Sequence, residues 1–268
     1  MIDLIQITND PSFAARCNAI PGMRLMVDLE RLGKASRQAG LNTFISTHEM
    51  ADVARIRAAA PSTPLMVRVN PVHAGSAAEI DAALQGGADL LMLPMFKSAD
   101  TLRDFVRMVD GRKPVVPLLE TAEALACIED WTALPGLWEV YVGLNDLHLS
   151  LGLDFMFEPL ARGDVQKVAL CSRARGLRFG FGGIARLDEG MLPGRAVLAE
   201  HVRLGSQAVI LSRTFHRSES EGSLESHVQA LREAEQALAA RTPAQVQADA
   251  SDTAQRIAGI VHSLRARP

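Results

Sequence analysis

Short apolar runs alternate with segments of helical periodicity along almost the whole chain. Most of these runs are continuously apolar, which is typical of parallel strands that are buried on both faces. Parallel neighbours need a crossover connection, and the periodic segments are long enough to supply it as helices. The predicted strands cover residues 4–8, 24–29, 65–70, 90–94, 115–120, 140–144, 178–182 and 208–212.

The segments between the strands are rich in Ala, Leu, Arg and Glu and are predicted to be crossover helices. Eight strands joined in this way favour a closed (β/α)8 TIM barrel of the α/β class over an open doubly wound sheet, which more often has fewer strands. At 268 residues and 48% hydrophobic content, the chain suits one large domain. The clearest helical segments span residues 76–85, 99–110, 122–131, 160–175 and 195–204.

Two stretches depart from the simple strand–helix rhythm. Residues 33–61 are longer than a crossover and contain their own apolar piece at 43–46, which either covers the barrel mouth or adds a strand. After a catalytic barrel predicted for residues 1–240, Pro243 marks a break and residues 241–268 form a helical extension. Apolar residues recur there at helical spacing, so one face packs either on the barrel or on a neighbouring subunit.

Charge and cysteine content narrow the function classes. The formal net charge of −3, from 28 basic and 31 acidic residues, leaves no basic stripe for nucleic acid. No apolar stretch approaches the ~20 residues that cross a bilayer, and the chain begins without a leader-like segment, so we expect a cytoplasmic protein with no membrane partner. Cys17, Cys127 and Cys171 are odd in number and widely separated, which suggests neither a disulfide framework nor a zinc site.

Two carboxylates follow neighbouring strand candidates. Glu120 ends the run 115–120, and Asp146 follows the run 140–144. The carboxyl ends of barrel strands meet at one rim, so the two acids are expected to converge on one cation, and carboxylate oxygens are the ligands that Mg²⁺ and Mn²⁺ prefer. The alternative is that each acid caps or supports a separate loop.

Arg68 lies in the strand candidate 65–70, where a cation is costly to bury unless it faces an anion. Asp28 and Glu30 end the previous strand candidate on a shared side and can supply that anion. An arginine held in this way is oriented and can offer paired donors to a substrate oxygen. The alternative is a salt bridge at the barrel mouth that takes no part in chemistry.

Five short motifs occur in order between residues 24 and 155: Asp28-Leu29-Glu30 with Lys34, Val67-Arg68-Val69-Asn70, Gly87-Ala88-Asp89 before Leu93-Pro94, Leu118-Leu119-Glu120-Thr121-Ala122-Glu123, and Gly143-Leu144-Asn145-Asp146-Leu147 before Leu151-Gly152. Together they resemble the HpcH/HpaI aldolase and citrate lyase β-subunit family, within the phosphoenolpyruvate/pyruvate-type TIM barrels. The combination is far more specific than any single motif.

This resemblance implies a divalent-metal-dependent carbon–carbon lyase of class II aldolase type. By it, Glu120 and Asp146 ligate Mg²⁺ or Mn²⁺, and a 2-oxoacid such as pyruvate chelates the ion. Arg68, oriented by Glu30, steadies the enolate oxygen, and backbone N–H groups at Thr121 hold the substrate carboxylate. The partners implied are a 2-oxoacid, an aldehyde and further copies of the chain in a homo-oligomer, a trimer or hexamer.

The chain departs from the pattern of the family's aldolases at one position. Aldolases of the family usually carry Asp-Gly-Glu-His after the second strand, and here the histidine position reads Arg31. His48 lies in the following segment and is either the acid/base of the reaction or a helix cap or surface residue. Later, Gly182 and Gly183, with Arg186, either bind a phosphate or distal carboxylate or allow close packing of strand and helix.

Two other functions stay open at this stage. The first is an acyl-CoA lyase or hydrolase of citrate lyase β type, although the Gly-rich turn to His-Pro of those enzymes is missing from this chain. The second is a barrel that binds metal without catalysis, because Arg31 replaces the expected histidine.

Overall fold

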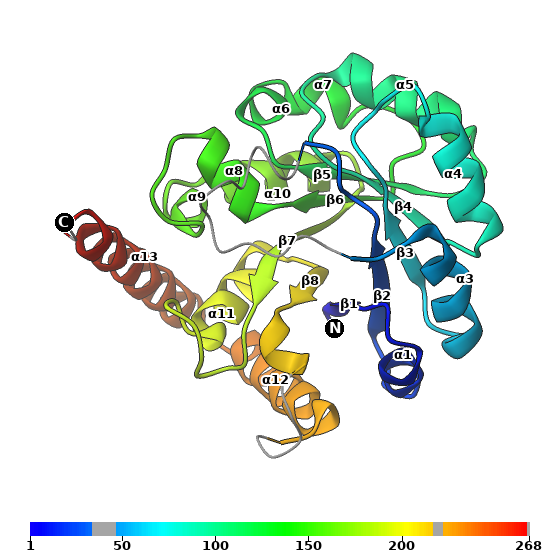
Figure 1. Cartoon of the computed structure of the whole chain (residues 1–268). Helices are drawn as coiled ribbons and strands as arrows, with labels where there is room; N and C mark the ends of the chain where they lie inside the picture. The colour runs from blue at the N-terminus through cyan, green and yellow to red at the C-terminus, as the bar shows by residue number, and fades with distance from the viewer. Residues whose placement is uncertain (34–46, 217–221, 267–268) are drawn as a thin grey trace.

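The computed structural model describes residues 1–33, 47–216 and 222–266. Lys34 and the apolar piece at 43–46 lie outside these residues. The strands form one closed, all-parallel barrel in sequence order, as the apolar runs predicted (Figure 1). They are β1 (Asp3–Ile7), β2 (Met23–Asp28), β3 (Leu65–Arg68), β4 (Leu90–Leu93), β5 (Val115–Leu119), β6 (Glu139–Val142), β7 (Arg178–Ile184) and β8 (Ala208–Leu211).

Helices surround the barrel and cover the outer faces of its strands (Figure 1). The outer residues of the strands pack on these helices and their inner residues fill the barrel, so both faces of the strands are apolar. The described helices are α1 (Pro11–Asn18), α3 (Met50–Ala59), α4 (Ser76–Gln85), α5 (Ala99–Val109), α6 (Ala122–Ala126), α7 (Ile128–Trp131), α8 (Leu144–Ser150), α9 (Glu158–Ala161), α10 (Asp164–Ala174), α11 (Gly194–Leu204), the 3-10 turn η1 (Arg213–His216), α12 (Leu224–Ala239) and α13 (Pro243–Arg265).

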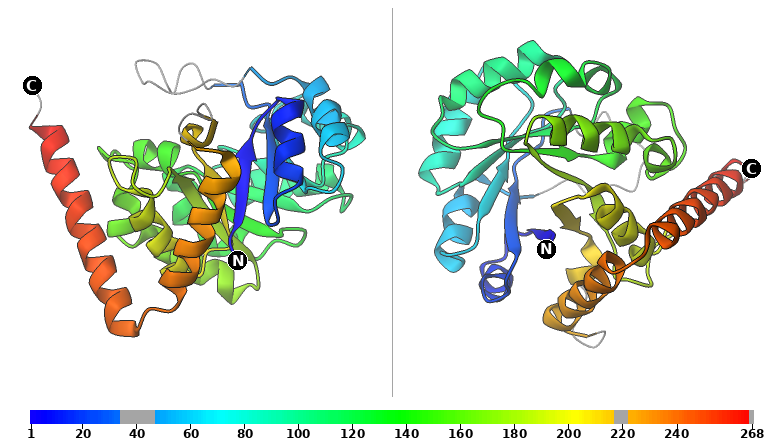
Figure 2. Two further views of the ribbon diagram at one scale, coloured as in Figure 1. Left: turned by 90° about the horizontal axis from the view of Figure 1, so that it is seen from below. Right: turned by 180° about the vertical axis from the view of Figure 1, so that it is seen from behind.

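The last helix begins at Pro243, where the sequence predicted a break, and Thr242 caps its first turn. In α13, Ile257 and Val261 are buried against the chain's own helices, among which α9 and α11 contact α13 (Figure 2). The predicted apolar face therefore packs on the barrel of its own chain. A contact between this helix and a neighbouring subunit stays a prediction. No described helix is long and apolar enough to cross a membrane.

β7 departs most from its predicted form. It continues past residue 182 to Ile184, and its pairing with β8 shifts register between Gly180 and Gly183. Tyr141, inside the barrel, bridges this irregularity: its hydroxyl donates to Gly182 O at 2.6 Å and accepts from Ile210 N at 2.7 Å. A Cβ on Gly180 would lie 2.8 Å from the Tyr141 ring, so glycine is needed there. The Tyr141 hydroxyl thus hydrogen-bonds to two backbone groups at the place where the β7–β8 pairing is irregular.

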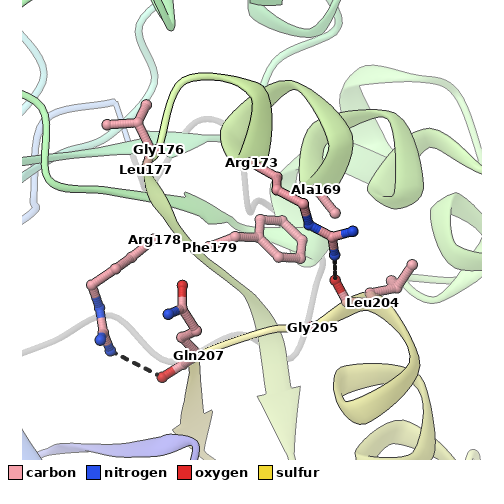
Figure 3. A pocket seen from close by; sticks show the side chains of 9 residues that line it. All are labelled: Ala169, Arg173, Gly176, Leu177, Arg178, Phe179, Leu204, Gly205 and Gln207. Atoms are coloured by element: carbon pink, nitrogen blue, oxygen red, sulfur yellow. Dashed lines mark hydrogen bonds between the residues drawn. The ribbon is translucent and has the colours of Figure 1, made fainter.

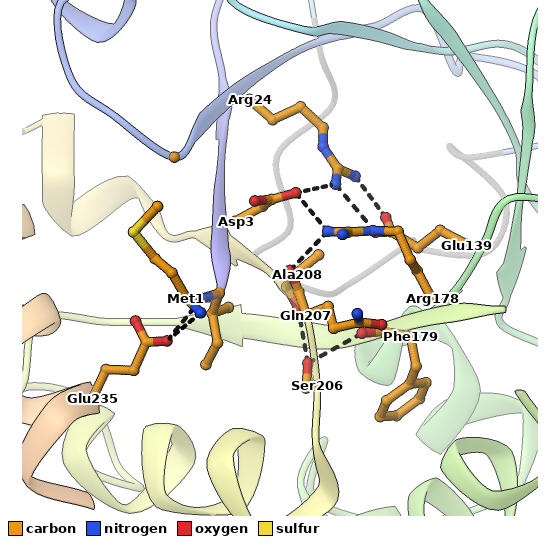
Figure 4. Close-up of polar contacts among 12 residues, drawn as sticks. Met1, Asp3, Arg24, Glu139, Arg178, Phe179, Ser206, Gln207, Ala208 and Glu235 are labelled. Carbon is orange, nitrogen blue, oxygen red and sulfur yellow. Dashed lines mark hydrogen bonds and ion pairs between the residues drawn. The ribbon is translucent and has the colours of Figure 1, made fainter. Parts of the chain in front are cut away.

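An ion network closes the amino-terminal end of the barrel (Figure 4). Arg24, almost fully buried, donates to Glu139 at 2.6 Å and to Asp3 at 2.7 Å, and Arg178 reaches the same two acids. Both guanidinium groups also lie over the Trp138 ring, at 4.9 and 4.7 Å from its centroid. Two cations face two anions, so the charges within this ion network are balanced.

This balance predicts a large effect for Glu139→Gln. The substitution removes one negative charge from a completely buried position and leaves Arg24 undercompensated, which should lower the free energy of unfolding by about 3 kcal/mol. Urea denaturation measures the change. The control is Asp104→Asn, which removes an exposed partner of Arg107 and should cost less than about 1 kcal/mol. Equal stability of the two variants would contradict a structural role for the network.

Candidate active site

A cavity of about 720 Å³ opens at the carboxyl end of the barrel strands. In (β/α)8 barrels this rim carries the functional groups, because the strand-to-helix loops converge there. The predicted residues Arg68, His48, Glu120, Asp146, Gly182 and Gly183 all line it. Glu30 and Thr121 lie beside it and do not appear in its lining.

Arg68 and Asp28 form the central ion pair of this cavity. They are register partners on β3 and β2, and two parallel hydrogen bonds of 2.8 Å join the guanidinium to the carboxylate. Glu30 contributes a longer contact of 3.4 Å, so Asp28 is the principal partner. Burial alone lowers the pKa of Arg68, but the surrounding carboxylates, Asp28 first, raise it above its usual value. The guanidinium is therefore a permanent, oriented cation.

His48 is buried and is held by the same residue that holds Arg68. The backbone N–H of Asp28 donates to His48 Nδ1 at 3.1 Å. Because Nδ1 accepts this bond, the neutral ring carries its hydrogen on Nε2. Arg31 adds a second restraint by donating from Nη2 to His48 O at 2.8 Å. The residue that replaces the expected histidine thus positions the segment that carries another one.

Glu120 and Asp146 reach the cavity from neighbouring elements. Glu120 follows the last residue of β5, is 3% exposed and lies 3.8 Å from Arg68 Nη1 through its Oε1 atom. Asp146 lies in the first turn of α8, because β6 ends at Val142 and Gly143 is the N-cap of the helix. The strand thus ends two residues before the end of the predicted strand 140–144.

Gly143 leaves the space that the Glu120 side chain occupies. A Cβ at this position would lie 2.6 Å from both Cγ and Oε1 of Glu120. Its N–H donates to Leu119 O at 2.9 Å, which extends the β5–β6 ladder up to the acid. The turn into α8 is thus held against the strand end that carries Glu120.

The donor set fits a hard divalent cation that is held by few protein ligands. Glu120 and Asp146 offer carboxylate oxygens on the same cavity. Within residues 1–33, 47–216 and 222–266, no group of three or more His, Cys, Asp or Glu side chains is placed to hold a metal. Mg²⁺ is commonly bound by one or two carboxylates, with substrate and water completing the shell.

The remaining predicted residues have mainly structural contacts. The Thr121 hydroxyl donates to Phe96 O at 2.8 Å and accepts from Ala124 N at 3.1 Å, which caps α6. Gly182, at φ 56°, and Gly183 belong to the irregular part of β7, and a Cβ on Gly182 would lie 2.8 Å from Leu144. Arg186 lies 3.7 Å from Glu189 and outside the cavity lining.

His201 lies away from the cavity, within α11. Its ring stacks on Phe181 at a centroid distance of 3.7 Å, and Nδ1 lies 2.8 Å from the Ser206 hydroxyl. Burial lowers the pKa of His201 to about 3, so the ring is neutral. The ring therefore serves packing within the protein.

A second cavity, of about 300 Å³, lies between α10, α11 and the starts of β7 and β8 (Figure 3). Its arginines are used internally: Arg173 donates to Leu204 O and Arg178 to Gln207 O, each at 3.2 Å. No carboxylate lines it. The predicted carboxylates instead line the main cavity, at the carboxyl end of the strands.

Sequence reasoning missed one residue that lines the main cavity, Tyr141, and one that holds a lining residue in place, Arg31. Tyr141, the one tyrosine of the chain, shapes the β7–β8 wall, and Arg31 was noted only as a departure from a pattern. For Tyr141 the sequence held only a weak signal: a single tyrosine in the strand candidate 140–144, followed by the glycine-rich strand candidate 178–182. Nothing in the sequence indicated that Arg31 would turn back to the His48 backbone.

The fit of Gly143 predicts that Gly143→Ala weakens metal binding. The added methyl must displace the Glu120 carboxylate, and the Mn²⁺ dissociation constant, measured by titration calorimetry, should rise about tenfold or more. Gly259→Ala in α13 is the control, because a Cβ there meets nothing within 4 Å. Unchanged Mn²⁺ affinity in Gly143→Ala would show that Glu120 does not bind the ion from this position.

Several solved structures resemble the fold of this chain. The HpcH/HpaI aldolase from Desulfitobacterium hafniense DCB-2 is 18% identical, with a TM-score of 0.63 and coverage of 87% of this chain and 93% of that one. An HpcH/HpaI aldolase/citrate lyase family protein from Burkholderia cenocepacia J2315 is 19% identical, with a TM-score of 0.63 and coverage of 87% and 94%. A citrate lyase β subunit from M. tuberculosis, complexed with oxaloacetate and magnesium, is 19% identical, with a TM-score of 0.57 and coverage of 87% and 96%.

At these identities the solved structures support the fold alone. No curated protein matches the sequence. The family assignment comes from the model of the HpcH/HpaI aldolase/citrate lyase family, which matches residues 9–181 of the 268 in the chain. The match spans more than half of the chain and includes Arg68, Glu120 and Asp146, so the protein belongs to the HpcH/HpaI aldolase/citrate lyase family, a family of lyases.

Proposed function

We propose that the protein is a divalent-metal-dependent carbon–carbon lyase of aldolase type, which cleaves or forms a bond to pyruvate or a related 2-oxoacid. The observation that carries the proposal is the convergence of Glu120, Asp146 and the Asp28-held Arg68 on one cavity. Such a cavity offers two anionic ligands for a cation and one fixed cation for an oxygen that gains negative charge. The related citrate lyase β subunit, which was solved with oxaloacetate and magnesium, supports the metal and the acid.

A bound Mg²⁺ or Mn²⁺ would supply Lewis-acid polarisation of the substrate carbonyl. Glu120 and Asp146 would hold the ion, and Arg68 would donate to the oxygen of the enolate. Asp28 would fix the Arg68 guanidinium before the substrate arrives, so the guanidinium would need little reorganisation as negative charge develops on the enolate oxygen. Donors oriented in advance are the main source of electrostatic stabilisation in enzymes.

His48 is proposed to handle the proton and hydrogen bond at the aldehyde oxygen. With Nδ1 occupied by the Asp28 N–H, the ring works through Nε2, and it is kept in place by the contact of Arg31 with His48 O. A neutral imidazole in this tautomer donates a hydrogen bond to an oxygen that becomes an alkoxide. Glu30 supports Arg68 from its longer contact. The expected homo-oligomer, trimer or hexamer, stays a prediction.

The metal site is tested by Glu120→Gln and Asp146→Asn. Each variant replaces a ligand by a neutral isostere and should abolish stoichiometric Mn²⁺ binding in titration calorimetry, with the circular dichroism spectrum unchanged. Glu123→Gln is the matched control, because Glu123 pairs with Lys97 on the surface three residues after Glu120. Full Mn²⁺ occupancy in both site variants would refute the assignment.

Exchange of the pyruvate methyl protons with deuterated water, followed by NMR, tests the chemistry. The metal-loaded protein should exchange them, and Arg68→Lys, which loses the paired bonds to Asp28, should slow exchange by about 100-fold. His48→Gln should reduce aldol turnover by about tenfold or more while retaining Mn²⁺.

Other outcomes point to the other functions. Turnover of malyl- or citramalyl-CoA, without exchange of free 2-oxoacids, would favour an acyl-CoA lyase or hydrolase. Absence of both activities in a protein that binds Mn²⁺ would favour a non-catalytic metal-binding barrel.

A further inference from the structure

The chain just after β2 is anchored by a residue that follows the neighbouring strand. Asn70 lies two residues beyond the end of β3, and its side-chain oxygen Oδ1 accepts from two consecutive backbone N–H groups, those of Arg31 at 2.8 Å and Leu32 at 2.9 Å. Arg31 and Leu32 are exposed, so a contact with a fixed element decides where their backbone lies. One amide oxygen thus anchors the backbone that carries the Arg31 side chain.

Glu79 fixes the orientation of the Asn70 amide. It lies in the first turn of α4 and accepts from Asn70 Nδ2 at 2.7 Å and from Asn70 N at 3.2 Å. Its other oxygen lies 3.2 Å from Nε2 of His73, whose Nδ1 accepts from the Gly75 N–H at 3.0 Å. Because a carboxylate accepts hydrogen bonds and an amide nitrogen donates them, Nδ2 of Asn70 faces Glu79 and Oδ1 faces the two N–H groups. The amide is therefore held in one orientation by residues outside the cavity lining.

The anchored backbone extends its effect to His48 through the Arg31 side chain. Arg31 Nη2 donates to His48 O at 2.8 Å, and the Asp28 N–H donates to His48 Nδ1 at 3.1 Å. The first contact fixes the backbone of His48 and the second fixes its ring. Asp28 belongs to β2, whereas Arg31 stands on exposed backbone that Asn70 anchors. A shift of Arg31 would therefore move the His48 backbone and draw the ring away from the Asp28 N–H.

We propose that Asn70 is a positioning residue for the reaction, which holds His48 at the cavity through Arg31 while Glu79 keeps the Asn70 amide oriented; it rests on the proposed function, in which His48 acts at the aldehyde oxygen. An acid or base works only within hydrogen-bond reach of the reacting atom, so a small displacement slows the step. The end of β3 then serves both reactants, with Arg68 for the 2-oxoacid and Asn70 for the group that meets the aldehyde.

Asn70→Ala removes the acceptor of both N–H groups and leaves the metal ligands and Arg68 in place. With pyruvate, propanal and Mg²⁺, kcat of aldol formation should fall about fivefold or more, while KM for pyruvate and the Mn²⁺ dissociation constant change less than about twofold. Asn18→Ala is the matched control, because Asn18 Oδ1 accepts from the backbone N–H groups of Ser62 and Thr63, at 3.1 Å each, away from the cavity lining. Unchanged kcat in Asn70→Ala, or an equal fall in the control, would overturn the assignment.

A double-mutant cycle separates positioning from a general loss of stability. In a background of Arg31→Ala, and equally of His48→Gln, adding Asn70→Ala should lower kcat by less than about twofold, because Asn70 acts through these two residues. Full multiplication of the single-variant losses would show that Asn70 affects the rate by another route, and would overturn the assignment.

An exchange of charge between Asn70 and Glu79 keeps the test decisive if Asn70→Ala does not fold. Asn70→Asp retains an acceptor for the two N–H groups but sets a carboxylate against that of Glu79, so kcat should fall. Adding Glu79→Gln supplies an amide donor to the new carboxylate and should restore kcat to within about twofold of the wild type. A double variant that folds and stays as slow as Asn70→Asp would contradict the role of this contact.

The His48 ring gives a reading that does not depend on turnover. In long-range ¹H–¹⁵N NMR at mildly alkaline pH, wild-type His48 should carry its hydrogen on Nε2. Asn70→Ala should bring the two ¹⁵N shifts closer together, since a displaced ring loses the Asp28 N–H and samples both tautomers, whereas Asn18→Ala should leave them unchanged. Identical His48 shifts in the wild type and Asn70→Ala would overturn the assignment. Absence of aldol turnover in the wild type would instead count against the proposed function, while the His48 spectrum would still decide the role of Asn70.

Discussion

The paired hydrogen bonds between Arg68 and Asp28 are the interaction on which the rest of the site depends. An arginine that ends a barrel strand would be costly without a partner, and the register of β2 against β3 places Asp28 directly beside it. The same aspartate uses its backbone N–H to hold His48. Two groups with different chemistry are thus oriented by one residue, and any shift of β2 against β3 would misplace both.

The stabilising ion network and the candidate active site lie at opposite ends of the barrel. At the amino-terminal end, Arg24, Arg178, Asp3 and Glu139 form a balanced ion network that closes the interior (Figure 4). At the carboxyl end, the three carboxylates of Asp28, Glu30 and Glu120 pair with Arg68, and Asp146 lines the same cavity. The local excess of negative charge suits a divalent cation. The apolar layer between the two ends keeps the two sets of charges apart.

Arg31 occupies the position where the family's aldolases usually carry a histidine, and it holds the backbone of another histidine, His48. Its side chain contacts the carbonyl of His48, and the His48 ring reaches the cavity from the segment before α3. An imidazole is therefore present at the rim although the expected position lacks one.

The sequence by itself determined the barrel, because eight apolar runs with helical crossovers satisfy their two buried faces in one closed parallel sheet. It also indicated Glu120, Asp146 and Arg68, since carboxyl ends of neighbouring strands share one rim. Only the tertiary structure decided that Asp28 outranks Glu30 as the partner of Arg68, that Asp146 stands in a helix turn and that Tyr141 repairs the β7–β8 bulge. These outcomes depend on strand register and on side-chain contacts between segments far apart in the chain, which local periodicity does not encode.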